Sequence, residues 1–179
     1  MGIRMNSQSG LTLVELMVTL AVAVVLFYAA VPQVQSFLAS NRASTQVNLF
    51  RSGIALAREW AVVNDATVSV CAKASKATDE LLCGDKDDWP NGWIVFRDED
   101  GNPGELDGSD VPLRVYISMN GSPQITTTKS SFSFRPDGMS TDVNISRIQL
   151  TQLGARADST RCLHVSPAGL IRLERASCP

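Results

Sequence analysis

One acidic side chain lies near the start of a long apolar run, where a charge is unfavourable unless a partner compensates it. Glu15 is that residue, and no residue between Glu15 and Arg42 carries a formal charge. Because about 20 apolar residues in a helix cross a hydrocarbon core of about 30 Å, this run predicts a membrane-spanning helix. An uncompensated acid in such a helix costs about 2.5–3.5 kcal/mol on insertion scales. Glu15 therefore requires a positively charged partner.

Cleavage of the chain after Gly10 would create that partner. The leader before the apolar run contains Arg4 and no acid, which favours a cytoplasmic leader and export of the remainder. The new amino group would lie four residues from Glu15, a spacing at which groups on one helix meet. The amine of a neighbouring subunit could neutralise the same carboxylate. We therefore expect cleavage and Glu15 to belong to one mechanism.

The same residues resemble the class III signal of type IV pilins and pseudopilins. The likeness consists of Gly10, the sequence Leu-Thr-Leu-Val-Glu over residues 11–15, and the apolar run. In that family a prepilin peptidase cuts after the glycine and methylates the new N-terminus, so the resemblance implies a mature chain that begins at N-methylated Leu11. It also places the family's assembly glutamate on Glu15 and its helix-kinking proline on Pro32. The implied partners are other major and minor pilins and the inner-membrane assembly machinery.

Four cysteines lie in the part of the chain that is predicted to be exported. An even number of cysteines in an oxidising periplasm indicates disulfides, and three pairings are possible. Short loops cost less entropy to close, which favours Cys71–Cys83 and Cys162–Cys178. A zinc site is disfavoured because the chain has no C-x-x-C motif and His164 is its only histidine.

Arginines near the C-terminus are candidates for binding the phosphates of DNA. The guanidinium group offers a charged fork to phosphate, and each neutralised phosphate releases counterions. The formal net charge of −2 excludes a basic field over the whole molecule, so a patch would have to be local. A solvated strand edge protected by positive side chains is the alternative. The candidate residues are Arg156, Arg161, Arg172 and Arg175.

Alternating oxygen-bearing side chains between residues 98 and 107 are weak candidates for binding calcium. Carboxylate and amide oxygens are hard ligands of the kind that Ca²⁺ prefers. The EF-hand pattern is absent, however, and Asp and Gly also supply the conformations of an ordinary turn. The sequence therefore predicts an acidic hairpin loop without a metal. The weak candidates are Asp98, Asp100, Asn102 and Glu105.

No motif in the sequence supports an enzymatic activity. The chain lacks a G-x-S-x-G elbow and a phosphate-binding glycine loop, and it has no cysteine–histidine pair with a plausible catalytic role. We expect no catalytic residue and no cofactor.

The periodicity of apolar residues defines the elements that carry these groups. A stripe at helical spacing continues the helix beyond the membrane, and its members are Val47, Phe50, Ile54, Ala57 and Ala61. This helix is expected to end near Asn64 and Asp65, a polar pair suited to a turn. Seven short strands are expected at residues 67–71, 93–96, 113–117, 132–135, 145–150, 162–165 and 170–173.

These elements predict an α+β fold in which a long helix packs on an antiparallel β-sheet or a β-sandwich. We expect a leader over residues 1–10, a membrane or filament-core helix over 11–38, an amphipathic half-helix over 39–64 and a periplasmic β-rich domain over 65–179. The protein is expected to be a single-pass inner-membrane protein before it enters a fibre.

The globular part is similar to the GspH/FimT group of minor pilins and pseudopilins, which includes FimT- and FimU-like members. The similarity lies in Trp-Pro-Asn-Gly-Trp-Ile-Val-Phe at 89–96, Phe-Arg-Pro-Asp-Gly at 134–138, and the hairpin at 162–169. Members of this group are low-abundance subunits at or near the tip of a pilus or pseudopilus. The resemblance therefore implies a minor type IV pilin that supports assembly, with a type II secretion pseudopilin as one alternative.

A DNA-binding minor pilin for natural transformation is the other alternative. The DNA-binding branch of the group carries a Gly-Arg-x-Arg motif on its last hairpin. This chain reads Gly-Leu-Ile-Arg at 169–172, so Arg172 matches the second arginine and Leu170 replaces the first. The motif is half met.

Overall fold

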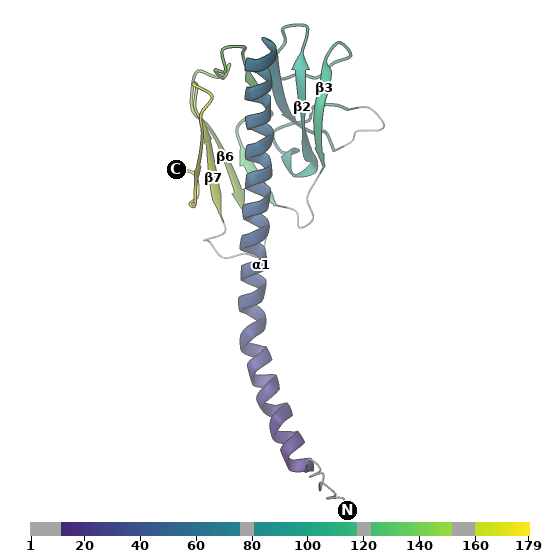
Figure 1. Cartoon of the computed structure of the whole chain (residues 1–179), viewed down its shortest axis with the longest axis vertical. Coiled ribbons are helices and arrows are strands. Elements are labelled where there is room, and N and C mark those ends of the chain that lie inside the picture. Colours follow the sequence, from purple (N-terminus) through teal and green to yellow (C-terminus); the bar gives the residue numbers. More distant parts are fainter. Residues whose placement is uncertain (1–11, 76–80, 118–122, 152–159) are drawn as a thin grey trace, which may run out of the picture. The chain divides into compact units, whose positions relative to one another are not determined.

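The computed structural model describes residues 12–75, 81–117, 123–151 and 160–179 (Figure 1). The chain divides into two compact units between Phe37 and Leu38. The helix α1, Leu13–Asn64, contributes residues to both units. Thr12 caps its N-terminus, because the Thr12 Oγ1 accepts a hydrogen bond from the Glu15 N–H at 3.2 Å.

The N-terminal unit consists, in its described part, of the apolar portion of α1. Large apolar side chains are exposed on all sides here, including Leu13, Val18, Val25 and Phe27. This portion is long and apolar enough to cross a membrane. An apolar surface around a whole helix is stable in lipid or among other apolar helices, and unfavourable in water.

The C-terminal unit contains two four-stranded antiparallel sheets and the second half of α1. The first sheet has the order β3-β2-β1-β5, with β1 at Thr67–Ala72, β2 at Gly92–Asp98, β3 at Val111–Ile117 and β5 at Ser131–Phe134. The second has the order β4-β6-β7-β8, with β4 at Gln124–Thr127, β6 at Ser146–Thr151, β7 at Arg161–Val165 and β8 at Ile171–Glu174. The predicted α+β class is therefore confirmed.

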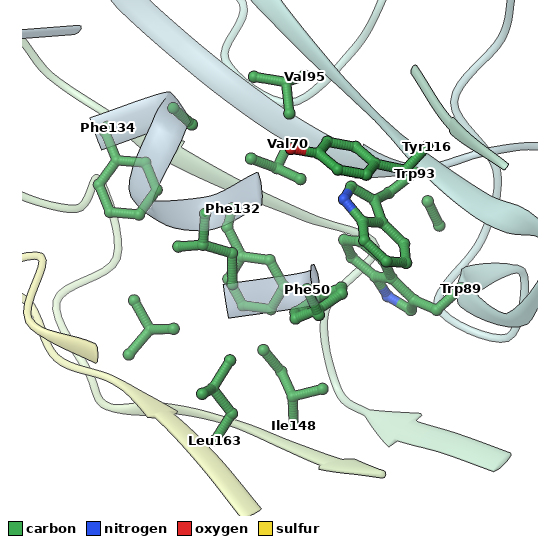
Figure 2. Packing of buried hydrophobic residues seen from close by; sticks show 14 of the residues in the cluster. Phe50, Val70, Trp89, Trp93, Val95, Tyr116, Phe132, Phe134, Ile148 and Leu163 are labelled. Carbon is green, nitrogen blue, oxygen red and sulfur yellow. The ribbon is translucent and has the colours of Figure 1, made fainter. Parts of the chain in front are cut away.

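A single core joins α1 to both sheets. All five members of the predicted helical stripe, from Val47 to Ala61, are buried. They pack against Val70 and Phe132 of the first sheet and against Ile148 and Leu163 of the second. Figure 2 shows Phe50 of α1 among these side chains. The stripe thus fixes which face of the helix both sheets cover.

The boundaries of the predicted elements agree with the structure to within two residues, and the described part of the chain contains two additional elements. The helix ends at Asn64, and Asp65 then adopts a left-handed φ of 49°, which stops the helix. β4 was not predicted, because its sequence Gln-Ile-Thr-Thr has one apolar residue and lacks an alternating pattern. A short 3₁₀ helix, η1 at Trp89–Asn91, also precedes β2. The described residues therefore contain eight strands instead of seven.

Both disulfides join cysteines that are close in sequence. The pairs are Cys71–Cys83 and Cys162–Cys178, the pairing that loop entropy favours. The first attaches the segment before η1 to β1. The second attaches the C-terminal segment to β7, and the Cys178 N–H also donates a hydrogen bond to Gln149 Oε1 of the neighbouring β6 at 3.0 Å.

Candidate functional site

Glu15 lies in the first turn of α1 and is exposed, as are the apolar residues on either side of it. Thr12 and Glu15 occupy the N-cap and N3 positions, which matches the sequence pattern of a capping box. Gly10 and Leu11 lie outside the described residues. α1 continues through position 32, the site of Pro32. An acid in the first turn of a helix interacts favourably with the positive end of the helix dipole, and the exposed carboxylate of Glu15 is accessible to an amine.

The three candidate DNA-binding arginines among the described residues have different surroundings. Arg161 is only 5% exposed; its Nη1 donates to the Thr160 carbonyl oxygen and its Nη2 to Ser44 Oγ. Arg161 lies on the core-facing side of β7, the side that also carries Leu163 and Val165. It therefore cannot belong to a surface patch, which corrects the prediction for this residue.

The other predicted arginines have different surroundings. The Arg172 side chain is 80% exposed, with its Nε 3.3 Å from Glu174 Oε1. Arg175 is also exposed. Arg156 lies outside the described residues.

A basic row crosses the outer face of the second sheet. Arg147 of β6 pairs in register with His164 of β7, which pairs in turn with Arg172 of β8. The His164 Nε2 lies 3.5 Å from Glu174 Oε2, so an acid borders the row. The sequence signal for Arg147 is the alternation of β6: Ile148 and Leu150 face the core, so Arg147 lies on the opposite face.

Leu170 lines a surface groove where the half-met motif would place an arginine. The groove has a volume of about 550 Å³ and lies between the end of α1 and the turn before β8. Its lining includes Arg51, Arg58 and Val62 of the helix and Leu170, which is 63% exposed. The helix wall of the groove also carries the acid Glu59, so it does not supply the net positive charge that an arginine at 170 would add.

The resemblance motifs in the globular part form structural contacts. Trp89 donates its Nε1–H to the Lys129 carbonyl oxygen at 2.8 Å, and Trp93 stacks on Tyr116 with ring centroids 4.9 Å apart. The Phe50 ring meets both indoles edge-on at 5.1 and 5.0 Å (Figure 2). These aromatics belong to the core and do not form a stacking surface.

The other two motifs meet at Arg58 of α1. The Arg58 Nε donates to the Gly138 carbonyl oxygen at 2.9 Å. Gly169 has a φ of 70°, and a Cβ atom there would lie 2.2 Å from that oxygen and 2.7 Å from Arg58 Nε. Only glycine fits this position. We call Arg58, Gly138 and Gly169 the arginine clasp.

Carboxylates gather at the connection from β2 to β3. Oxygens of Asp98, Asp100 and Asp110 lie within 4.8 Å of one another. Asp110 is not among the residues predicted from the sequence, whereas the predicted Asn102 and Glu105 are hydrogen-bonded to each other at 2.7 Å. Burial raises the pKa of Asp98; the Gly101 N–H opposes this effect and the charge of Asp110 adds to it.

Comparison with known families decides the relationship. The family described as type II transport protein GspH matches residues 46–169, more than half of the chain. The chain belongs to the GspH family. A prokaryotic N-terminal methylation motif also matches residues 5–30 of this GspH-family protein, a range that includes Gly10 and Glu15.

Solved structures show that the fold of this GspH-family protein is that of a minor pilin. Two crystal forms of the type IV minor pilin FimU from Pseudomonas aeruginosa strain PAO1 resemble it. The form in space group P65 is 21% identical, with a TM-score of 0.53, and the match covers 75% of this chain and 91% of FimU. The P21 form is 20% identical, with a TM-score of 0.51 over 80% and 90% of the two chains. No curated protein matches.

The family, the methylation motif and the apolar helix agree on the kind of protein. Pilins and pseudopilins are structural subunits that assemble with other pilins, and this GspH-family protein shares their architecture. Together these findings indicate a membrane-anchored subunit of a pilus or pseudopilus.

Proposed function

We propose that this GspH-family protein is a minor type IV pilin that is incorporated at or near the pilus tip and supports pilus assembly. The observation that carries the proposal is the exposed apolar portion of α1, which begins at Leu13 and lies largely within the match to the N-terminal methylation motif over residues 5–30. A prepilin peptidase removes residues 1–10 and methylates Leu11. The β-rich domain faces the periplasm while the helix resides in the inner membrane, and the protein acts without catalytic residues or a cofactor.

Assembly transfers the apolar part of α1 from lipid to a bundle of similar helices. In the membrane, the side chains over residues 11–38 contact lipid; in the filament, they contact the helices of other pilins, so the same surface serves both states. Glu15 pairs with an N-terminal amine and fixes the axial register, and Pro32 provides the family's kink. The division of the chain between Phe37 and Leu38 supports a boundary near residue 38.

Processing at Gly10 tests the first step. We expect Gly10→Phe to leave the protein at its full precursor mass, because a bulky side chain occupies the position where the peptidase requires glycine. Gly2→Phe, which places the same side chain elsewhere in the leader, should be processed normally. Intact-mass spectrometry and sequencing of the N-terminal peptide distinguish the two products. A mature-sized product from Gly10→Phe would contradict the cleavage assignment.

The basic row favours DNA binding as a second candidate function. Arg147 and Arg172 flank His164 on an exposed sheet face, and Arg175 follows β8. A phosphate backbone laid across β6, β7 and β8 would meet these groups in turn. The neighbouring Glu174 and the loss of Arg161 from the surface weaken the row, which is why assembly remains the first proposal.

Salt-dependent binding tests this second function. If the row binds DNA, the affinity of the full chain in detergent micelles should fall steeply with salt. Arg147→Ala/Arg172→Ala should then reduce the slope of log K against log salt by about 2, since each phosphate contact contributes about 0.9. Arg51→Ala/Arg135→Ala, with the same loss of charge elsewhere, is the matched control. Absence of binding at low salt would leave assembly as the function.

A GspH-like pseudopilin of a type II secretion system is the remaining alternative, favoured by the description of the matching family. The same cleavage, insertion and helix packing would apply in either machine. Purification of the assembled fibre under mild crosslinking would identify which pilins or pseudopilins neighbour this subunit.

A further inference from the structure

We propose that Asp98, Asp100 and Asp110 form a calcium-binding site where β2 ends and β3 begins. Asp98 is the last residue of β2, and Asp110 directly precedes β3. The register pairs Arg97 with Val111, so the next residue outward on each strand is one of these two acids. The strand pairing therefore holds two carboxylates of the site in place, and Asp100 joins them from the connecting loop.

One oxygen of Asp98 has no partner although its side chain is buried. Asp98 is only 7% exposed. Its Oδ1 accepts a hydrogen bond from the Gly101 N–H at 2.8 Å, but its Oδ2 is fully covered and has no hydrogen-bond donor among the described residues. A buried carboxylate oxygen without a donor is unfavourable by several kcal/mol unless a proton or a cation satisfies it.

The second buried acid increases this demand. Asp110 is 8% exposed, and both of its oxygens accept backbone hydrogen bonds at 3.0 Å, from the Glu99 and Asp107 N–H groups. Within the described ranges, none of Asp98, Asp100 and Asp110 forms an ion pair, and the nearby Arg97 pairs with Glu99. Two buried carboxylates thus lie together without a positive charge.

The donor set selects calcium among the common cations. All three ligands are carboxylate oxygens, which are hard donors suited to Ca²⁺ or Mg²⁺ and poorly suited to softer metals. Calcium–oxygen distances of about 2.3–2.6 Å place opposite ligands about 5 Å apart, in agreement with oxygens that lie within 4.8 Å of one another. Magnesium retains most of its water and usually binds only one or two carboxylates. We expect a dissociation constant of about 10⁻⁴–10⁻³ M, the range of extracellular calcium modules.

Asp98→Asn should remove the proposed calcium site without disturbing the fold. The asparagine keeps the oxygen that accepts the Gly101 N–H and replaces the unpartnered oxygen with an amide group. Without metal this variant should be at least as thermally stable as the wild type, because it removes one of two crowded buried charges. Asp87→Asn, an exposed acid paired with Lys86, loses the same charge at a distant position and is the matched control.

Calorimetric titration of the full chain in detergent micelles with CaCl₂ tests the proposal. The wild type and Asp87→Asn should bind calcium, and at ten times the dissociation constant their Tm should rise by about 3–6 °C. Asp98→Asn should show neither effect, and MgCl₂ at equal ionic strength should raise the wild-type Tm by less. Absence of binding at about 10 mM CaCl₂, above the expected range, would overturn the proposal and leave a protonated Asp98. An equal Tm rise in wild type and Asp98→Asn, or with both salts, would overturn it too.

Discussion

Glu15→Ala should abolish incorporation of this protein into filaments while leaving its amount in the membrane unchanged. In the proposed filament, the Glu15 carboxylate and an N-terminal amine neutralise each other in an apolar surrounding. Removing one partner of a buried ion pair costs about 3–5 kcal/mol, because the other charge is left uncompensated. This cost corresponds to a loss of incorporation of more than about 100-fold. Immunoblots of sheared filaments and of membrane fractions measure the two quantities.

Glu15→Ala should not weaken insertion of the helix into the membrane. Alanine carries no charge, so Glu15→Ala removes the insertion penalty of the acid. Glu59→Ala provides a control, because Glu59 is an exposed acid on the same helix in the C-terminal unit. Normal amounts of Glu15→Ala in sheared filaments would show that the Glu15 carboxylate has no role in assembly.

Phe50→Ala should lower the free energy of unfolding of the C-terminal unit by about 3–5 kcal/mol. Phe50 is fully buried, and its ring contacts the indoles of Trp89 and Trp93. Truncation leaves a cavity between α1 and η1 and removes both edge-on contacts. Since domains are stable by only about 5–15 kcal/mol, the loss is a large part of the total. Urea unfolding of the full chain in micelles, followed by tryptophan fluorescence, measures it.

Two further variants serve as controls for the destabilisation expected from Phe50→Ala. Phe50→Leu fills much of the same volume and should be destabilised by a smaller amount. Val63→Ala lies on the exposed side of the same helix and should change stability by less than about 0.5 kcal/mol. A loss below 1 kcal/mol for Phe50→Ala would mean that the aromatic cluster does not hold α1 against the sheets.

The helix was predictable because its signals are local. The five-residue stripe from Val47 to Ala61 repeats at the helical period, and each member is buried. The adjacent polar residues Asn64 and Asp65 also marked its end correctly. No long-range information was needed, since a single face of one helix determines the whole pattern.

The surface sites depend on strand pairing, which a single sequence does not define. Asp110 joins Asp98 only because β2 and β3 pair with a register that sets Arg97 against Val111. Arg147 and Arg172 are likewise brought into one row by two successive pairings through His164. The burial of Arg161 was predictable from the sequence, because strict alternation with Leu163 and Val165 places all three on one face.

The arginine clasp ties together three positions that lie far apart in the sequence. A side chain larger than hydrogen at 169 would displace the Gly138 carbonyl oxygen, and that displacement would break its hydrogen bond with Arg58. The effect of a change at any one of these positions therefore depends on the other two. Mutations at these three positions should be strongly epistatic. The helix and the motifs at 134–138 and 162–169 should therefore diverge as one unit, independently of the basic row and the acidic loop.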